Sequence, residues 1–170
     1  IEGLQKRGAT IRAFDPEAFL AMYPEFQVPE DQRRAWIEDR EGVLVGETTA
    51  QRYGWKVGDR IPIQGTIWHK KDGSMIWELT ARGIYTGDRT VDKTQFLFRY
   101  DYLDENRTNG QGITGWYLVK VADPARSADI AHAIDAQFEN SAFETKTATE
   151  KAMAQSFANQ VGDIGAIPAA

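Results

Sequence analysis

A GVLVG run at residues 42–46 limits most strongly what this chain can fold into. The run is short, apolar and rich in valine, so it predicts a buried strand. Residues 47–53 predict a brief helix that ends at Gly54, because glycine readily takes the left-handed conformation found at helix ends. A turn at residues 58–59 then leads into a strand that Pro62 restricts to a sheet edge or a bulge. Strands and helices are therefore mixed in this region.

The N-terminal third predicts one strand and two helices. Residues 8–14 have the composition of a short strand, and Asp15 followed by Pro16 is typical of a helix start. This first helix is expected to stop before Pro24, and a second helix is expected over residues 29–39.

The middle of the chain predicts a long hairpin over residues 65–86. Two β-rich runs flank an Asp-Gly pair at 72–73, which is a strong indicator of a tight hairpin turn. Residues 95–100 predict another strand. The polar, glycine-rich stretch 104–115 predicts a mobile loop.

The last third predicts a β-α-β-α unit, with strands at 116–121 and 143–147. The helix between the strands repeats apolar residues at every fourth position: Ile130, Ile134 and Phe138. A capping box at 147–150 opens a final helix. That helix has an apolar stripe formed by Met153, Phe157, Val161 and Ile164. The predicted fold class is α+β: a mixed sheet with this C-terminal unit and a strand-rich part with short helices.

The composition excludes several kinds of chemistry. The 170 residues include 20 Lys and Arg and 25 Asp and Glu, and the net charge of −5 disfavours a nucleic-acid partner, because phosphate binding needs a basic face. Cysteine is absent, which excludes thiol nucleophiles, zinc–thiolate sites and iron–sulfur clusters. The two histidines, His69 and His132, are far apart in the sequence. No run approaches the roughly 18 apolar residues of a membrane-spanning helix.

Catalytic and cofactor motifs are incomplete. Residues 110–115 match Gly-x-Gly-x-x-Gly, but a dinucleotide site needs a strand before the glycines and a helix after them. The same region lacks the glycine and glutamate of a calcium-binding loop. Acids at one loop edge (Asp101, Asp104 and Glu105) could supply a pair for glycosidic chemistry, although their clustering favours a solvated turn. We therefore expect no catalytic residue, metal or resident cofactor in this chain.

Two tryptophans are candidate partner-contact residues. Trp68 and Trp77 flank the predicted hairpin turn and could meet as a cross-strand pair. Ordinary packing within the sheet is the favoured interpretation. The alternative is an exposed apolar patch that docks a partner.

Segments in a particular order and spacing also carry a resemblance to a known family. Residues 42–63 contain a valine-rich strand, a small helix and then Gly-Trp-Lys-x-Gly-Asp. Residues 119–124 (VKVADP) with their helix, followed by 143–147 (FETKT), form a closing strand–helix–strand. Residues 14–25 and 155–165 fit the family's middle region and its final helix. Together these segments resemble the extracytoplasmic (periplasmic core) domains of MacB/FtsX-like ABC transporter permeases.

The resemblance implies one extracytoplasmic domain over residues 1–170, between the first two membrane helices of a bacterial inner-membrane permease. Residues 8–115, approximately, would form an inserted sabre-like part with connecting strands. Residues 116–165, approximately, would form the C-terminal half of a porter-like part whose N-terminal half is missing from this chain. The permease would act as a dimer with an ABC-type ATPase, in some members with a periplasmic adaptor protein. ATP would be bound by the separate ATPase subunit or domain.

The expected function is to convey ATP-driven conformational change to the periplasmic side for export or release of a substrate. The helix carrying Met153, Phe157, Val161 and Ile164 would link the domain to the membrane. Two alternatives stay open. One is a free periplasmic or secreted module that binds a ligand or peptide through the tryptophan hairpin or the glycine-rich loop. The other is an enzyme that uses two of the three acids named above.

Overall fold

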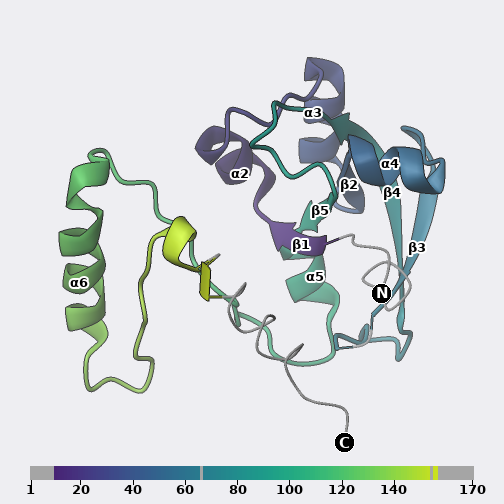
Figure 1. Cartoon of the computed structure of the whole chain (residues 1–170). Helices are drawn as coiled ribbons and strands as arrows, with labels where there is room; N and C mark the ends of the chain where they lie inside the picture. The colour runs from purple at the N-terminus through teal and green to yellow at the C-terminus, as the bar shows by residue number, and fades with distance from the viewer. Residues whose placement is uncertain (1–9, 66, 154, 157–170) are drawn as a thin grey trace, which may run out of the picture. The chain divides into compact units, whose positions relative to one another are not determined.

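The structure is a computed structural model that describes residues 10–65, 67–153 and 155–156 (Figure 1). The chain divides into two compact units, Ile1–Trp116 (unit 1) and Tyr117–Ala170 (unit 2).

Unit 1 contains a five-stranded mixed sheet in the order β1-β5-β2-β4-β3. β5 pairs parallel with β1 and antiparallel with β2, while β4 pairs parallel with β2 and antiparallel with β3. The mixed sheet with helices confirms the α+β class. The strands are β1 (Thr10–Phe14), β2 (Gly42–Gly46), β3 (Arg60–Gln64), β4 (Ile76–Tyr85) and β5 (Gln95–Arg99).

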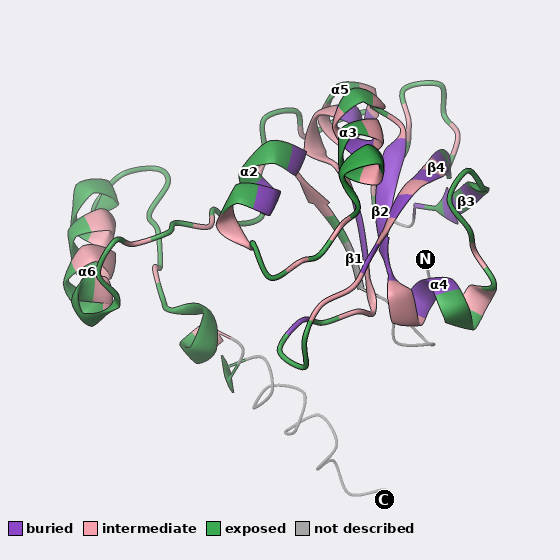
Figure 2. Cartoon of the chain, turned by 90° about the horizontal axis from the view of Figure 1, so that it is seen from above, coloured by how far each residue is buried: buried purple, intermediate pink, exposed green. Residues whose placement is uncertain are grey.

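Strand β2 is buried along its whole length at the centre of the sheet, and Figure 2 shows it in purple. Its side chains alternate between the two faces, as the pleat of a strand requires. Val43 and Val45 belong to one apolar cluster, and Leu44 belongs to the other. The apolar run predicted a buried strand correctly because both faces of this strand are covered.

Short helices contribute side chains to both clusters. The cluster that contains Val43 includes Ala50 of α4 (Glu47–Tyr53) and Tyr102 of α5 (Tyr100–Asn106). The cluster that contains Leu44 includes Phe19 and Leu20 of α2 (Pro16–Met22) and Trp36 of α3 (Glu30–Glu38). The apolar core therefore lies on both sides of one sheet.

Several local predictions are confirmed. The side chain of Asp15 caps α2 by accepting a hydrogen bond from the amide of Ala18 at 2.8 Å. Helix α4 ends at Gly54 in the left-handed conformation, with φ of +70°. β3, which contains Pro62, pairs only with β4 and forms one edge of the sheet.

The hairpin is formed by β3 and β4, with Gln64 opposite Ile76. The connection between them, residues 65–75, is longer than a tight hairpin loop. The Asp-Gly turn lies inside this connection, with Gly73 at φ of +83°. The dipeptide therefore predicted a turn correctly, but the turn does not join the two strands directly.

Helix α5 was not predicted. The sequence indicated a strand to residue 100 and a mobile loop from 104, whereas α5 covers Tyr100–Asn106. Its sequence, YDYLDEN, is polar and carries no long apolar stripe. Tyr102 nevertheless anchors the helix in the core, where its ring lies edge-on to Trp77 with centroids 5.7 Å apart.

In unit 2, the helix predicted after Asp123 is confirmed, whereas most of the predicted final helix lies outside the described residues. A 3₁₀ turn (η1, Pro124–Arg126), capped by Asp123, leads into α6 (Ser127–Phe138). The segments predicted as strands, 116–121 and 143–147, are in no ladder. This part of the predicted β-α-β-α unit is wrong, because a strand needs a neighbour to pair with and the described part of unit 2 provides none there. Several apolar side chains of these segments are exposed: Tyr117, Val119 and Phe143.

The carboxylate of Asp135 links α6 to the segment that follows it in unit 2. Asp135 on α6 accepts hydrogen bonds from the hydroxyl of Thr145 at 2.8 Å and from the amide and hydroxyl of Thr147 at 3.0 and 2.7 Å. Thr147 was predicted to cap the last helix. Thr149 does so instead, accepting from the amide of Ala152 at 3.2 Å.

Candidate functional site

Trp77 lies in the core of unit 1. Its side chain is buried, and its indole nitrogen donates a hydrogen bond to the carbonyl of Trp68 at 3.0 Å. The contact between the two residues is therefore a hydrogen bond from a side chain to a main-chain carbonyl, and not a cross-strand pair of stacked rings. Because its ring is enclosed, Trp77 is a packing residue, and the prediction that it contacts a partner is corrected.

Trp68 lies at the surface end of the same hairpin and is half-buried. Exposed apolar side chains accompany it on the connection and at the start of β4: Ile67, Met75 and Ile76. The first of these is 77% exposed, which is unusual for an isoleucine. We call Ile67, Trp68, Met75 and Ile76 the hairpin patch. Of the two predicted contact residues, only Trp68 belongs to a surface that a partner could reach.

The connection that carries this patch is held by its own hydrogen bonds. The amide of Ser74 donates to Asp72 at 2.9 Å, and the amide of Lys70 donates to the carbonyl of Ser74 at 2.9 Å. The amide of Gly65 donates to the carbonyl of Met75 at 2.6 Å. These bonds give the connection a defined shape over residues 67–75, which are not a strand.

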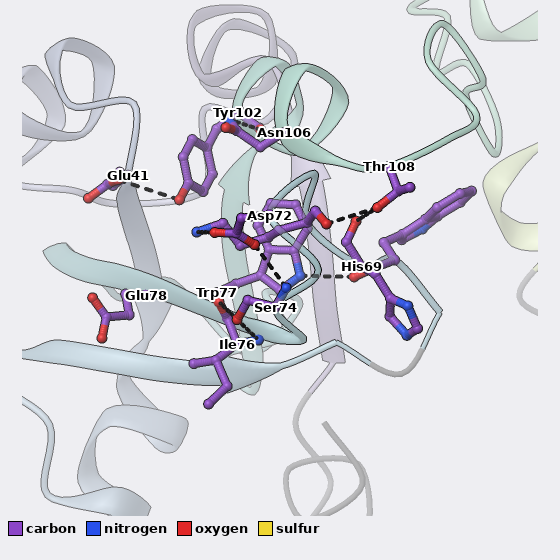
Figure 3. Close-up of polar contacts among 12 residues, drawn as sticks. Glu41, His69, Asp72, Ser74, Ile76, Trp77, Glu78, Tyr102, Asn106 and Thr108 are labelled. Atoms are coloured by element: carbon purple, nitrogen blue, oxygen red, sulfur yellow. Dashed lines mark hydrogen bonds and ion pairs between the residues drawn. The ribbon is translucent and has the colours of Figure 1, made fainter.

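The end of α5 holds the connection from the other side (Figure 3). The hydroxyl of Thr108 donates to the carbonyls of His69 and Lys70 at 3.1 and 2.9 Å, and the amide of Lys71 donates to the carbonyl of Asn106 at 2.8 Å. No pattern in the sequence indicates this contact, since α5 itself was not expected.

The three acids considered for catalysis each face an arginine. Asp101 binds Arg99 at 2.7 Å, and Glu105 binds Arg40 at 2.5 Å. The hydrogen bond from Arg99 holds the pKa of Asp101 below its ordinary value, although partial burial opposes this shift. A general acid needs a raised pKa at neutral pH, so an arginine-paired carboxylate is unsuited to that role.

Asp104 has the same character. Burial acts to raise its pKa, but hydrogen bonds from the amide of Gly112 and from Arg107 outweigh burial and lower it. The three acids are therefore arranged as ion pairs, and we find no acid–base pair among them.

The two histidines belong to different units. His69 is exposed on the hairpin connection, and His132 is exposed on α6 of the other unit. Within the described residues, no group of three His, Asp or Glu side chains is placed to hold a metal ion.

The predicted membrane-coupling stripe lies mostly outside the described residues. Met153 is half-buried in the short helical stretch that follows Thr149. Phe157, Val161 and Ile164 lie outside the described residues. Across the part of the chain that the structure describes, no helix combines the length and the apolar character needed to cross a membrane.

Comparison with known proteins does not identify a family for this chain. No family model matches the chain, and no curated protein matches it significantly.

Proposed function

We propose that this chain belongs to the extracytoplasmic part of a MacB/FtsX-like ABC transporter permease and conveys ATP-driven conformational change to the periplasmic side, for export or release of a substrate. One observation carries the proposal. Residues 42–63, which bear the main resemblance, form a continuous block in unit 1 that consists of β2, α4, a turn and β3.

Each characteristic residue of that block has a physical role. Gly54 ends the helix in the left-handed conformation, and Gly58, at φ of +98°, donates its amide to the carbonyl of Ala81 on β4 at 2.7 Å. The carboxylate of Asp59 accepts from the amide of Lys56 at 2.8 Å and shapes the turn. Structural roles for the two glycines and the aspartate support the resemblance better than matching letters alone.

The chemistry of the site also favours a mechanical role. A domain that conveys motion needs packed, rigid elements. It does not need a carboxylate whose pKa is raised for catalysis. Unit 1 has apolar clusters on both faces of its sheet, and Asp101, Asp104 and Glu105 are paired with arginines. In this proposal the parent protein lies in the bacterial inner membrane as a dimer, with an ABC-type ATPase on the cytoplasmic side.

The hairpin patch is the surface at which we expect a periplasmic partner, such as an adaptor protein, to bind. Its apolar side chains neighbour Lys71 on the same connection, whereas Lys70 is already paired with Asp72, so a partner with apolar anchors and an acidic group opposite Lys71 would fit it. The same patch favours the alternative function, a free periplasmic module that holds a peptide there.

The decisive experiment uses the full-length parent protein in its own membrane. A helix-breaking insertion next to Gly162 is expected to abolish transport while ATP turnover continues, because the link between membrane and domain is interrupted. The matched control is the same insertion at the exposed turn 88–90 of unit 1, which should leave transport intact. Unchanged transport after insertion at Gly162 would contradict the proposed coupling.

The reading frame on either side of this segment separates the two functions. One apolar stretch of about 20 residues upstream and three downstream is what the permease requires. A signal peptide without any such stretch would support the free binding module instead.

A further inference from the structure

The glycine-rich loop that was predicted to be mobile is held by three side chains of α5 and its C-terminal end. The carbonyl of Ile113 lies 3.1 Å from the hydroxyl of Tyr100 and accepts a bond from the guanidinium of Arg107 at 3.0 Å. The carboxylate of Asp104 accepts from the amide of Gly112 at 2.9 Å and forms an ion pair with Arg107. We call Tyr100, Asp104 and Arg107 the clamp.

The clamp also reaches the hairpin patch. The guanidinium of Arg107 lies over the ring of Trp68, 4.6 Å from its centroid, and only 2% of the arginine side chain is exposed. The same indole packs against Gly110, where an added Cβ would come within 3.0 Å of a ring carbon. Trp68 is thus in contact with both the clamp and the loop that the clamp holds.

The ring of Trp68 is one of the groups that hold Arg107 in position. Its Nε is buried and has no hydrogen-bond partner among the described residues, so part of the guanidinium is stabilised by the indole face and not by an acceptor. A planar cation stacked on an aromatic ring keeps one orientation. If the ring moves, this support is removed, and the guanidinium is held by its bonds to Asp104 and Ile113 without the indole face.

We propose that Arg107 couples the position of Trp68 to the rigidity of residues 110–114. Displacement of the hairpin patch then loosens the main chain of residues 110–114, which lie just before the end of unit 1 at Trp116. The coupling lies within unit 1 and does not depend on the transporter proposal. It adds to that proposal a route by which contact at the patch changes the stiffness of the loop.

The test is amide hydrogen exchange of Gly112, measured by NMR on the whole chain, in Trp68→Leu and in a matched control, Trp55→Leu. Trp55 also packs on the core cluster, but it stacks on Tyr53 and contacts Phe96, away from the clamp. The global stability of each variant is measured separately by urea unfolding, so that a change in local opening at Gly112 is distinguished from general destabilisation.

In Trp68→Leu, exchange at Gly112 should rise at least about fivefold, the change that corresponds to the loss of one typical hydrogen bond. In Trp55→Leu it should stay within about twofold. Unchanged exchange in Trp68→Leu, or an equal rise in both variants, would overturn the coupling. Should Trp68→Leu fail to fold, Trp68→Phe replaces it, with a smaller rise expected because the phenyl ring still offers a face to Arg107.

A second pair of variants tests the clamp itself. Tyr100→Phe removes a hydroxyl that contacts Ile113 and Asp104, whereas Tyr102→Phe removes a hydroxyl of the same helix that lies 3.4 Å from Glu41. Only the first should speed exchange at Gly112. If Tyr100→Phe speeds exchange while Trp68→Leu does not, the clamp exists without the coupling and the proposal is wrong.

Discussion

Arg107 and Trp68 form a cation–π pair at the surface end of the sheet, with the guanidinium 4.6 Å from the ring centroid. The pair joins a residue at the end of α5 to the connection between β3 and β4. A buried cation is costly unless it is paired and hydrogen-bonded, and here Asp104 and the carbonyl of Ile113 complete its environment. The stability of this end of unit 1 should therefore depend on Arg107.

Arg107→Ala is expected to lower the free energy of unfolding by about 3–5 kcal/mol, because it removes a buried ion-pair partner and leaves a cavity against the indole. Urea unfolding followed by tryptophan fluorescence measures this change. Arg60→Ala is the control: the Arg60 side chain is 63% exposed, and its surface ion pairs should contribute about 1 kcal/mol or less. Similar losses for both variants would contradict a structural role for Arg107.

Gly46→Ala should destabilise unit 1 by roughly 1–3 kcal/mol or more, the cost of overpacking a close contact. A Cβ at Gly46 would lie 2.1 Å from the carbonyl oxygen of Lys93, which belongs to the main chain and cannot move aside cheaply. Gly115→Ala is the control, since nothing lies within 4 Å of its Cβ position. Thermal unfolding of the two variants gives the comparison, and equal midpoints would be inconsistent with this packing.

Burial, reinforced by the nearby charge of Glu41, raises the pKa of Tyr102 to about 12. The folded state thus favours the neutral phenol. The stabilisation that this gives is complete below about pH 10, the pKa of an unfolded tyrosine, and is lost as the pH rises toward 12. Ultraviolet titration should show an ionisation step near pH 12 that Tyr102→Phe removes, while Tyr85, whose pKa is also raised by burial, still ionises late. Glu41→Gln should move that step to lower pH, and an unmoved step would show that the charge has no part in the shift.

In unit 2, hydrogen bonds from Thr147 and Thr145 hold the pKa of Asp135 below its ordinary value. The folded state therefore favours the carboxylate, and the sign follows: the stabilisation is present above about pH 4, the unfolded pKa, and is lost as the pH falls through the folded pKa. The amide resonance of Thr147 should shift as the carboxylate is protonated. Asp135→Asn should abolish that transition, and a Thr147 amide that still titrates in the variant would assign it to another group.

The elements that sequence analysis located are those with local causes. Asp15 caps the helix that follows it, Gly54 ends one in the left-handed conformation, and the run at 42–46 is apolar because both of its faces are covered. Each of these features is decided by neighbouring residues or by burial alone, so the amino-acid pattern is sufficient to predict it.

The features that it missed depend on contacts distant in sequence. Helix α5 is polar along most of its length and is secured through Tyr102, whose partner Trp77 lies in another strand. The burial of Arg107 depends on Trp68, and no local pattern indicates a cation in such a place. The segments 116–121 and 143–147 have strand composition, but composition does not provide a neighbour to pair with.

Strand β2 has a thermodynamic consequence for unit 1. Val43 and Val45 face one apolar cluster and Leu44 faces the other. Neither cluster can therefore unfold unless β2, which both clusters share, leaves its place in the sheet. The two halves of the core are thereby made cooperative, and calorimetry should record one heat-absorption peak for unit 1 whose van't Hoff and calorimetric enthalpies agree.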